Sequence, residues 1–591
     1  MAQYLPPIRE IEHALYGIAG MAELASLAEF EEATPDLVHA ILEEAGRFAA
    51  NVLSPINRTG DLEGARLEDG EVRTPAGWKD AYRTWIESGW GGIAFPAEFG
   101  GHGLPRLLAT AAHEMWQGAN MAFTLNPMLT NAVADAILLH GSETQKKRLV
   151  SPLVSGEWTG TMCLTEPQAG SDLGAIRCKA VPEGDSYRIS GQKIFITYGE
   201  HDLAENILHM VLARIPGAPD GVKGISLFIV PKIKVSPDGT LLERNSVRCV
   251  SLEHKLGIHA SPTSVLAFGD GEGAEGYLVG EANRGLEYMF TMMNESRLAV
   301  GVQGIGIAEQ AFQAARHYAR ERIQGKAYDA REGKSVPIIR HPDVKRMLIT
   351  MKSEIEAMRG LAYCTAAWLD KAEKHPDPAA RKRSLALAEL LTPVVKGWCT
   401  EQGVLIASAA VQVHGGTGYI EETGVAQYLR DARIATIYEG TTGIQANDLM
   451  DRKVRRNGGE SMRALVDIMR GTLAELDDGS DLALQLEAAI DALERATSWV
   501  LAQKSESGLP AAAAVPYLHL LGTVAGGWVM ARSALAAIQK LKTDTEHADF
   551  CRARLATAKF YADNVLPRAA GLTENVVRGS EAVFALDEAL I

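Results

Sequence analysis

The chain is poor in cysteine, and its few cysteines lie far apart. Zinc sites and disulfide frameworks need closely or regularly spaced cysteines, so neither is expected here. A sequence without paired cysteines is typical of a reducing compartment, and we expect a cytoplasmic protein. The 591 residues contain six: Cys163, Cys178, Cys249, Cys364, Cys399 and Cys551.

Long hydrophobic runs and an excess of basic residues are also missing. No run of 18 or more uncharged apolar residues occurs, which argues against a membrane-spanning helix. The start, Met1 to Glu10, lacks the basic and then apolar pattern of a signal peptide. The net charge of -15 would repel a phosphate backbone. Membrane association and nucleic-acid binding are therefore not expected.

The first part of the chain has a helical pattern. Thr34-Pro35-Asp36 is a favourable helix start, with a hydroxyl at the N-cap and proline in the first turn. The apolar residues that follow recur at helical spacing and predict one buried face. They are Leu37, Ile41, Ala45, Phe48 and Val52.

A β pattern replaces the helical one near Thr159. Tyr187 to Ile189 and Lys193 to Thr197 predict the two strands of a hairpin, with Ser190-Gly191 as its turn. Further short apolar runs predict a β-domain of about 120 residues. These runs are Ile207 to Ala213, Ile225 to Val230 and Ser264 to Phe268.

Helical periodicity returns after Gly280 and is interrupted by a loop from Gln324 to Arg340. Gly458-Gly459 reads as a linker, and the Ala- and Leu-rich stretch that follows predicts a further helical domain. We therefore predict four domains: residues 1–158, 159–280, 281–455 and 461–591.

A single acidic residue, Glu439, stands in the small and apolar stretch Arg433 to Thr441. A carboxylate among apolar neighbours has a raised pKa, which suits a general base. The alternative is a glutamate that only caps a helix or pairs with Arg433.

Together with the glycine-rich loop His414 to Tyr419 and the stretch Met162 to Asp172, this segment resembles the acyl-CoA dehydrogenase family, over roughly Leu37 to Asp448. The resemblance implies an α+β fold: an N-terminal helical domain, a middle β-barrel domain and a C-terminal helical bundle, here with an extra C-terminal helical domain. It also implies that Glu439 takes the α-proton of an acyl-CoA thioester while a hydride leaves the β-carbon for FAD.

The resemblance implies a set of FAD contacts. Phe195 would pack on the flavin ring, where many members of the family have tryptophan. Arg322 and the loop Gln412 to Gly416 would reach the FAD of a neighbouring subunit, which implies at least a dimer. The full set is Leu164, Thr165, Gly170, Ser171, Phe195, Thr197, Arg322, Gln412, Gly416 and Thr441.

The substrate contacts implied in the same way are Ser171, Asn294, Arg297, Tyr438 and Gly440, and no metal is implied. Some branches of the family carry the base on an earlier helix, at the position of Ser296. Glu295 is one residue away, which is about 100° of rotation on a helix. We keep Glu295 as the rival base.

We expect α,β-dehydrogenation of a medium- to long-chain fatty acyl-CoA in β-oxidation, with electrons passed to an electron-transfer flavoprotein. The alternative substrate is 3-methylthiopropanoyl-CoA, in a pocket lined partly by Met121 to Met128.

The sequence of the C-terminal domain disfavours two other functions, DNA binding and membrane attachment. A DNA-binding alkylation-response flavoprotein needs a basic domain, but residues 461–591 hold 12 basic and 17 acidic side chains. Membrane attachment through Tyr517 to Gly522 is disfavoured because the stretch is short, and core packing is expected instead.

Overall fold

The computed structural model describes residues 3–269, 271–328, 334–477, 479–543 and 546–591. The chain forms two compact units. The helical unit comprises residues 1–47, 105–119 and 297–591, and the sheet unit comprises residues 48–104 and 120–296. The long helix α9 (Gly285–Glu321) contributes residues to both units.

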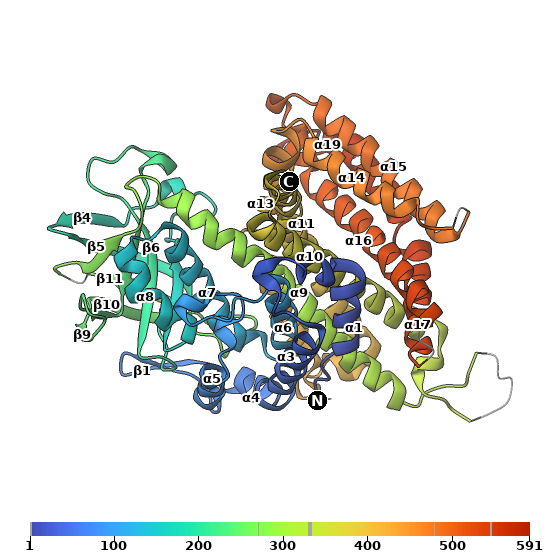
Figure 1. The fold of residues 1–591 in the computed structure, drawn as a ribbon, viewed down its shortest axis with the longest axis horizontal. Helices are drawn as coiled ribbons and strands as arrows, with labels where there is room; N and C mark the ends of the chain where they lie inside the picture. Colours follow the sequence, from blue (N-terminus) through green and yellow to red (C-terminus); the bar gives the residue numbers. More distant parts are fainter. Residues whose placement is uncertain (1–2, 270, 329–333, 478, 544–545) are drawn as a thin grey trace. The chain divides into compact units, whose positions relative to one another are not determined.

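The sheet unit contains an eight-stranded sheet (Figure 1). The strand order is β10-β11-β5-β12-β7-β6-β3, and β4 pairs with β5. β3 and β6 are parallel, and the other neighbours are antiparallel. The strands are β3 (Trp158–Cys163), β4 (Lys179–Glu183), β5 (Ser186–Thr197), β6 (Asn206–Ala213), β7 (Ser226–Pro231), β10 (Val247–Leu252), β11 (Thr263–Phe268) and β12 (Ala274–Leu278). β8 (Ile233–Val235) and β9 (Leu241–Arg244) form a separate pair.

The predicted hairpin turn at Ser190-Gly191 is wrong, because β5 runs through it without a break. The first half of β5 pairs with β4 and β12, and its second half pairs with β11. Gly191 has φ +139°, and a Cβ there would lie 2.4 Å from the sulfur of Cys178. Glycine is therefore required by a close approach and not by a turn.

Helices flank the sheet. α7 (Met121–His140) packs on β3, where a Cβ at Gly160 would lie 2.6 Å from Val133. The other helices of this unit are α4 (Ser54–Glu63), α5 (Trp78–Glu87) and α8 (Glu143–Ser155). A small hairpin of β1 (Arg66–Glu68) and β2 (Glu71–Arg73) lies in the region that we expected to be wholly helical. Its three-residue strands are too short to give a periodic signal.

The predicted buried face near the N-terminus is partly wrong. In α3 (Pro35–Phe48), Leu37 is 38% exposed, whereas Val38, Leu42 and Ala45 are fully buried. The buried face therefore begins one residue later than the apolar spacing suggested.

The helical unit is built from long helices and ends in the predicted helical C-terminal segment (Figure 1). Its central helices are α6 (Arg106–Ala119), α10 (Pro342–Lys374), α11 (Pro378–His414), α12 (Val425–Ala435), α13 (Thr442–Asn447) and the π-helix η11 (Asp448–Arg455). The C-terminal segment contains α14 (Glu460–Leu473), α15 (Asp481–Ala502), α16 (Leu509–Thr543), α17 (Ala548–Asn564) and α18 (Arg568–Glu574). Shorter helices are α1 (Ile8–Glu12), α2 (Met21–Leu24) and α19 (Ser580–Ala582).

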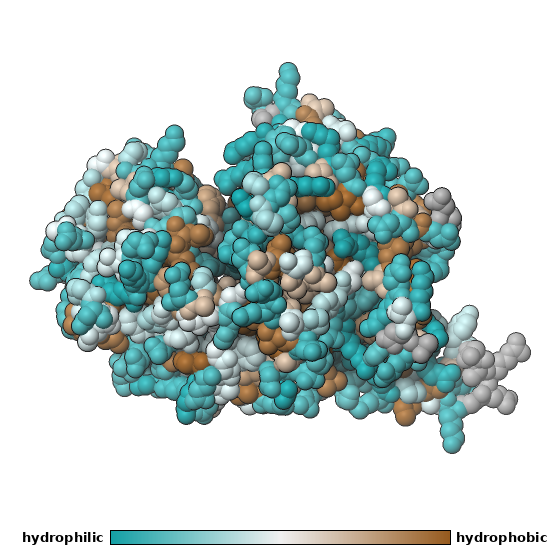
Figure 2. Space-filling model, viewed as in Figure 1, coloured by the Kyte–Doolittle hydropathy of each residue, from teal (hydrophilic) through white to brown (hydrophobic). Residues whose placement is uncertain are grey.

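Two described helices, α7 and α16, are long and apolar enough to cross a membrane. In their most apolar stretches, 78% and 67% of the residues are buried inside the protein, as in the core helices of many globular proteins. Tyr517, Leu518 and Leu521 on α16 are fully buried, so the predicted core packing of this stretch is confirmed. On the face shown in Figure 2, apolar side chains lie scattered among hydrophilic ones.

Candidate active site

The first predicted flavin-binding segment follows β3. Leu164 and Thr165 are half-buried and leave the strand directly after Cys163. The buried ammonium of Lys193, on β5, donates to the Leu164 carbonyl at 2.9 Å and to the Glu166 carboxylate at 2.8 Å. This contact fixes the segment against the sheet.

Glu166 organises the loop that follows. Its carboxylate accepts hydrogen bonds from the backbone N–H groups of Arg177 at 2.6 Å and Cys178 at 3.0 Å. Burial alone would raise the pKa of Glu166, but the Lys193 ammonium and these N–H groups outweigh it, so the pKa is lowered. Sequence reasoning assigned no role to Lys193 or Glu166.

The second predicted flavin-binding segment lies beside the first. The N–H of Ile194 donates to the Thr165 carbonyl at 2.9 Å, and the Thr161 hydroxyl donates to the Thr197 carbonyl at 2.8 Å. Residues predicted from two separate stretches are therefore brought together, although β3 and β5 are not neighbours in the strand order.

Phe195 is the unusual residue of this segment. Its backbone has φ +60°, a conformation that residues other than glycine rarely adopt. Its side chain is 59% exposed. The register of β5 with β11 shifts at this point, as in a β-bulge. Bulges and strained backbone re-aim side chains at functional sites, so the outlier supports a binding role for the ring.

The loop after Thr165 is open. Gly170 and Ser171 are exposed, and a Cβ at Gly170 would meet nothing within 4 Å. The Asp172 side chain accepts a hydrogen bond from the N–H of Gly174 at 3.0 Å. Half-buried threonine side chains, an exposed aromatic face and an open polar loop form a donor set that fits a flavin nucleotide.

In the helical unit, Glu439 lies in the turn between α12 and α13. Its φ is +55° and that of Gly440 is +90°, so two successive residues are left-handed. The side chain of Glu439 is half-buried. Arg433 donates to the Thr436 hydroxyl, and the described residues show no ion pair between Arg433 and Glu439. The alternative role for Glu439, a simple ion pair with Arg433, is therefore not observed.

Side chains from neighbouring helices hold this turn. The ammonium of Lys396, on α11, donates to the Gly440 carbonyl at 2.6 Å, and the amide of Gln445 donates to the Glu439 carbonyl at 3.1 Å. The Thr441 hydroxyl, a predicted cofactor contact, caps α13 by accepting from the N–H of Ile444 at 3.3 Å. The phenol of Tyr438, a predicted substrate contact, donates to the side chain of Gln303.

The electrostatics suit a general base. Burial raises the pKa of Glu439, and the positive charges of Lys396 and Arg297 oppose that rise. Burial lowers the pKa of Lys396 to about 7, against the opposing effect of Glu439. Arg297, a predicted substrate contact, forms a buried ion pair with Asp448 at 3.1 Å.

The rival base lies on α9. Ser296 is buried and its hydroxyl has no hydrogen-bond partner among the described residues. Glu295 is half-buried and Asn294, a predicted substrate contact, is exposed. Successive residues of a helix differ by about 100°, so Glu295 cannot take the direction of Ser296.

The residues predicted to reach a neighbouring subunit share one surface of the helical unit. Arg322, Gln412 and Gly416 are exposed. The ring of His414 stacks on Tyr318, one turn before Arg322, with 4.4 Å between ring centres. The two ends of the loop from Gln324 to Arg340 are hydrogen-bonded to each other. The N–H of Gln324 donates to the Val336 carbonyl at 3.0 Å. Residues 329–333 of that loop lie outside the described residues.

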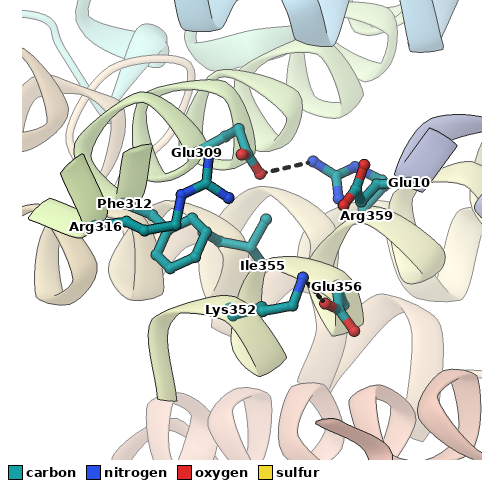
Figure 3. Close-up of a pocket in the computed structure, with 8 residues that line it drawn as sticks. All are labelled: Glu10, Glu309, Phe312, Arg316, Lys352, Ile355, Glu356 and Arg359. Atoms are coloured by element: carbon teal, nitrogen blue, oxygen red, sulfur yellow. Dashed lines mark hydrogen bonds and ion pairs between the residues drawn. The ribbon is translucent and has the colours of Figure 1, made fainter. Parts of the chain in front are cut away.

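A second cluster of charged side chains surrounds a small cavity of about 20 Å³ in the helical unit, roughly the space of one water (Figure 3). Arg359 pairs with Glu309 at 3.0 Å and Lys352 pairs with Glu356 at 2.9 Å (Figure 3). The cavity is too small for a thioester substrate. Most of its charged groups are paired, and Arg316 lies over the Phe312 ring. We assign the cluster a structural role.

Four consecutive segments match family descriptions of known proteins. Residues 36–157, 161–270 and 283–454 match "Acyl-CoA dehydrogenase, N-terminal domain", "middle domain" and "C-terminal domain". Residues 462–587 match "Acetyl-CoA dehydrogenase C-terminal like". A 3-methylmercaptopropionyl-CoA dehydrogenase of Ruegeria pomeroyi is 49% identical over 569 residues, which span 95% of this chain and 96% of that protein.

The chain belongs to the acyl-CoA dehydrogenase family. A butyryl-CoA dehydrogenase of Syntrophomonas wolfei is 35% identical, with 95% of each chain covered. The crystal structure of an acyl-CoA dehydrogenase of Bacillus anthracis complexed with FAD has the same fold, with a TM-score of 0.73 at 21% identity, over 96% of this chain and 91% of that chain.

Four predictions are thereby confirmed: the family, the α+β fold class with its extra C-terminal domain, the enzyme class and the cofactor. The protein is an FAD-dependent oxidoreductase that acts on the CH–CH group of an acyl-CoA.

Proposed function

We propose that this enzyme dehydrogenates 3-methylthiopropanoyl-CoA between its α- and β-carbons, with Glu439 as the base. The observation that carries the assignment of the base is the strained turn at Glu439 and Gly440, held by Lys396 and Gln445. Gly440 takes its conformation without strain, but a left-handed glutamate costs energy and persists only where the surrounding structure enforces it, often at active sites.

The α-proton of a thioester is weakly acidic, so the base must be well placed and have a suitable pKa. The Glu439 carboxylate takes this proton, and the raised pKa makes it a stronger acceptor than an exposed glutamate. FAD supplies the acceptor for the hydride that leaves the β-carbon. The residues around Thr165 and Phe195 would hold the flavin.

The substrate is assigned from the relatives. The protein from Ruegeria pomeroyi, similar over almost the whole chain, is named for the 3-methylthio compound, and the one from Syntrophomonas wolfei is named for a four-carbon acyl group. Both names favour a short acyl chain over the medium- to long-chain fatty acyl group that we first expected. Met121 and Met128 are buried on α7, and thioether side chains adapt well to a sulfur-containing ligand.

A rate series across acyl-CoAs tests the substrate. The 3-methylthiopropanoyl chain has the length of a pentanoyl chain with sulfur in place of one methylene. Pentanoyl-CoA keeps this length and should therefore react almost as well. Butyryl-CoA is one chain atom shorter, which in an apolar pocket is worth about 1–3 kcal/mol, so its kcat/KM should be roughly 10- to 200-fold lower. Octanoyl-CoA and palmitoyl-CoA should be poorer still. A kcat/KM that is highest for palmitoyl-CoA would restore the fatty acyl assignment.

We also propose that electrons leave to an electron-transfer flavoprotein and that the enzyme works as a dimer. The exposed Arg322, Gln412 and Gly416 support a shared flavin site. The Arg322→Ala variant should lose FAD while its apoprotein melts normally, and Arg320→Ala, two residues away on the last turn of α9, is the matched control. An active, FAD-loaded monomer in gel filtration would contradict the dimer.

A further inference from the structure

Lys396 is a fully buried lysine in an apolar part of α11. Its side chain has no exposed surface, and its neighbours Val394, Val395, Trp398 and Cys399 are also buried. A buried ammonium is costly, because water would otherwise solvate the charge. A lysine at such a position therefore needs an explanation beyond packing.

The C-terminal segment packs on α11 directly after this lysine. A Cβ at Gly397 would lie 2.8 Å from Leu518 on α16, and a Cβ at Gly522 would lie 2.3 Å from the ring of Trp398. These glycines make room for the side chains of Leu518 and Trp398 between the two helices. The extra helical domain thus covers α11 at the two residues that follow Lys396.

Within the described part of the chain, the ammonium of Lys396 makes one hydrogen bond, to the Gly440 carbonyl at 2.6 Å. A neutral donor would be enough to fix the turn, and Gln445 already donates to the Glu439 carbonyl. The position of the positive charge next to the turn therefore points to an electrostatic role as well.

Other charged and titratable groups surround the same turn. Arg297 is held by its ion pair with Asp448, and Glu401 accepts a hydrogen bond from the Thr442 hydroxyl at 2.6 Å. The groups on the neighbouring elements are Arg297 on α9, Glu401 on α11, Tyr438 and Glu439 in the turn, Asp448 and Arg452 on η11 and His519 on α16.

We propose that Lys396 is a positioning residue for Glu439, which fixes the Glu439–Gly440 turn and keeps the carboxylate in its ionised, proton-accepting form. The inference rests on the proposed function of Glu439 as the base. Because burial lowers the pKa of Lys396 to about 7, its ammonium is charged below pH 7, and there its charge opposes the rise that burial causes in the pKa of Glu439.

The test is the pH profile of flavin reduction by acyl-CoA under anaerobic conditions, measured by stopped flow on the FAD-loaded enzyme. Lys396→Met removes the charge at nearly the same volume. Its acidic limb should move upward by about one pH unit or more, since a nearby opposite charge lowers a carboxyl pKa by about 1–3 units. The rate should recover toward that of the wild type at high pH. Lys396→Arg keeps a charge and should leave the acidic limb near its original position.

A matched control is Lys453→Met, which removes a lysine that pairs with Glu389 on the same unit, at 3.0 Å. Its profile should not move. The proposal for Lys396 is wrong if Lys396→Met and Lys396→Arg shift the acidic limb equally. It is also wrong if neither variant shifts the limb while Glu439→Gln abolishes flavin reduction. In both cases the assignment of Glu439 as the base is kept. If Glu439→Gln reduces flavin normally, the proposed function itself fails. If Lys396→Met does not fold, the Lys396→Arg profile decides alone: a shifted limb overturns the proposal.

Discussion

Lys193 and Glu166 form a buried ion pair, with 2.8 Å between the ammonium and the carboxylate. The same ammonium donates to the Leu164 carbonyl, and the same carboxylate accepts two backbone N–H groups. The pair therefore connects both predicted flavin-binding segments to the sheet.

Replacing Lys193 by methionine should unfold the sheet unit more easily and release FAD. The variant leaves a buried carboxylate without its counter-charge, which costs about 3–5 kcal/mol. The thermal midpoint of the apoprotein and the FAD content of purified protein measure the two effects. The double variant Lys193→Met with Glu166→Gln removes the uncompensated charge and should recover most of the stability. Equal losses in the single and double variants would show that the charge is not the cause.

The same pair predicts a pH dependence. The pKa of Glu166 is lowered in the folded protein, so its stabilising contribution is complete above the unfolded pKa of about 4.3 and is lost as the pH falls through the folded value. In Lys193→Met, burial should instead raise this pKa, which destabilises the variant most at neutral pH. The difference in thermal midpoint between wild type and variant should therefore shrink from pH 7 to pH 4. A difference that stays constant over this range would contradict the prediction.

Phe195→Gly should separate stability from cofactor binding. Glycine adopts φ +60° without strain, and the exposed ring contributes little to the core, so the apoprotein should melt at the same temperature or slightly higher. The lost aromatic contact is worth about 0.5–1.5 kcal/mol, or roughly a 2- to 10-fold weaker affinity for FAD. Phe195→Trp should retain FAD. Titration of apoprotein with FAD measures the affinity, and a Phe195→Gly variant that binds as tightly as wild type would exclude the stacking role.

The sequence predicted those parts of the fold that local pattern controls. The change from helical to β periodicity near Thr159 and the helical C-terminal segment both appear in the structure. The turn at Ser190-Gly191 failed because glycine has two uses, and sequence alone does not distinguish a turn from a close approach. Here the sulfur of Cys178 requires the glycine.

Lys193 and Lys396 were missed because lysine is usually exposed, and a lysine beside apolar residues reads as a solvated position. The available signal was the surrounding sequence: Lys396 interrupts the apolar run from Leu390 to Cys399 near the middle of a long helix. The left-handed backbone of Phe195 and Glu439 could not be predicted either, because tertiary contacts impose it on residues that disfavour it.

The central claim is that Glu439 accepts the α-proton, and Glu439→Gln tests it most directly. Glutamine keeps the size of the side chain, so FAD and 3-methylthiopropanoyl-CoA should still bind. The rate of flavin reduction in anaerobic stopped flow should fall by about 10²–10⁴-fold or more, the contribution of a positioned base. Glu295→Gln, made in parallel, should cost little. Near-normal flavin reduction by Glu439→Gln, together with its loss in Glu295→Gln, would contradict the assignment and move the base to α9.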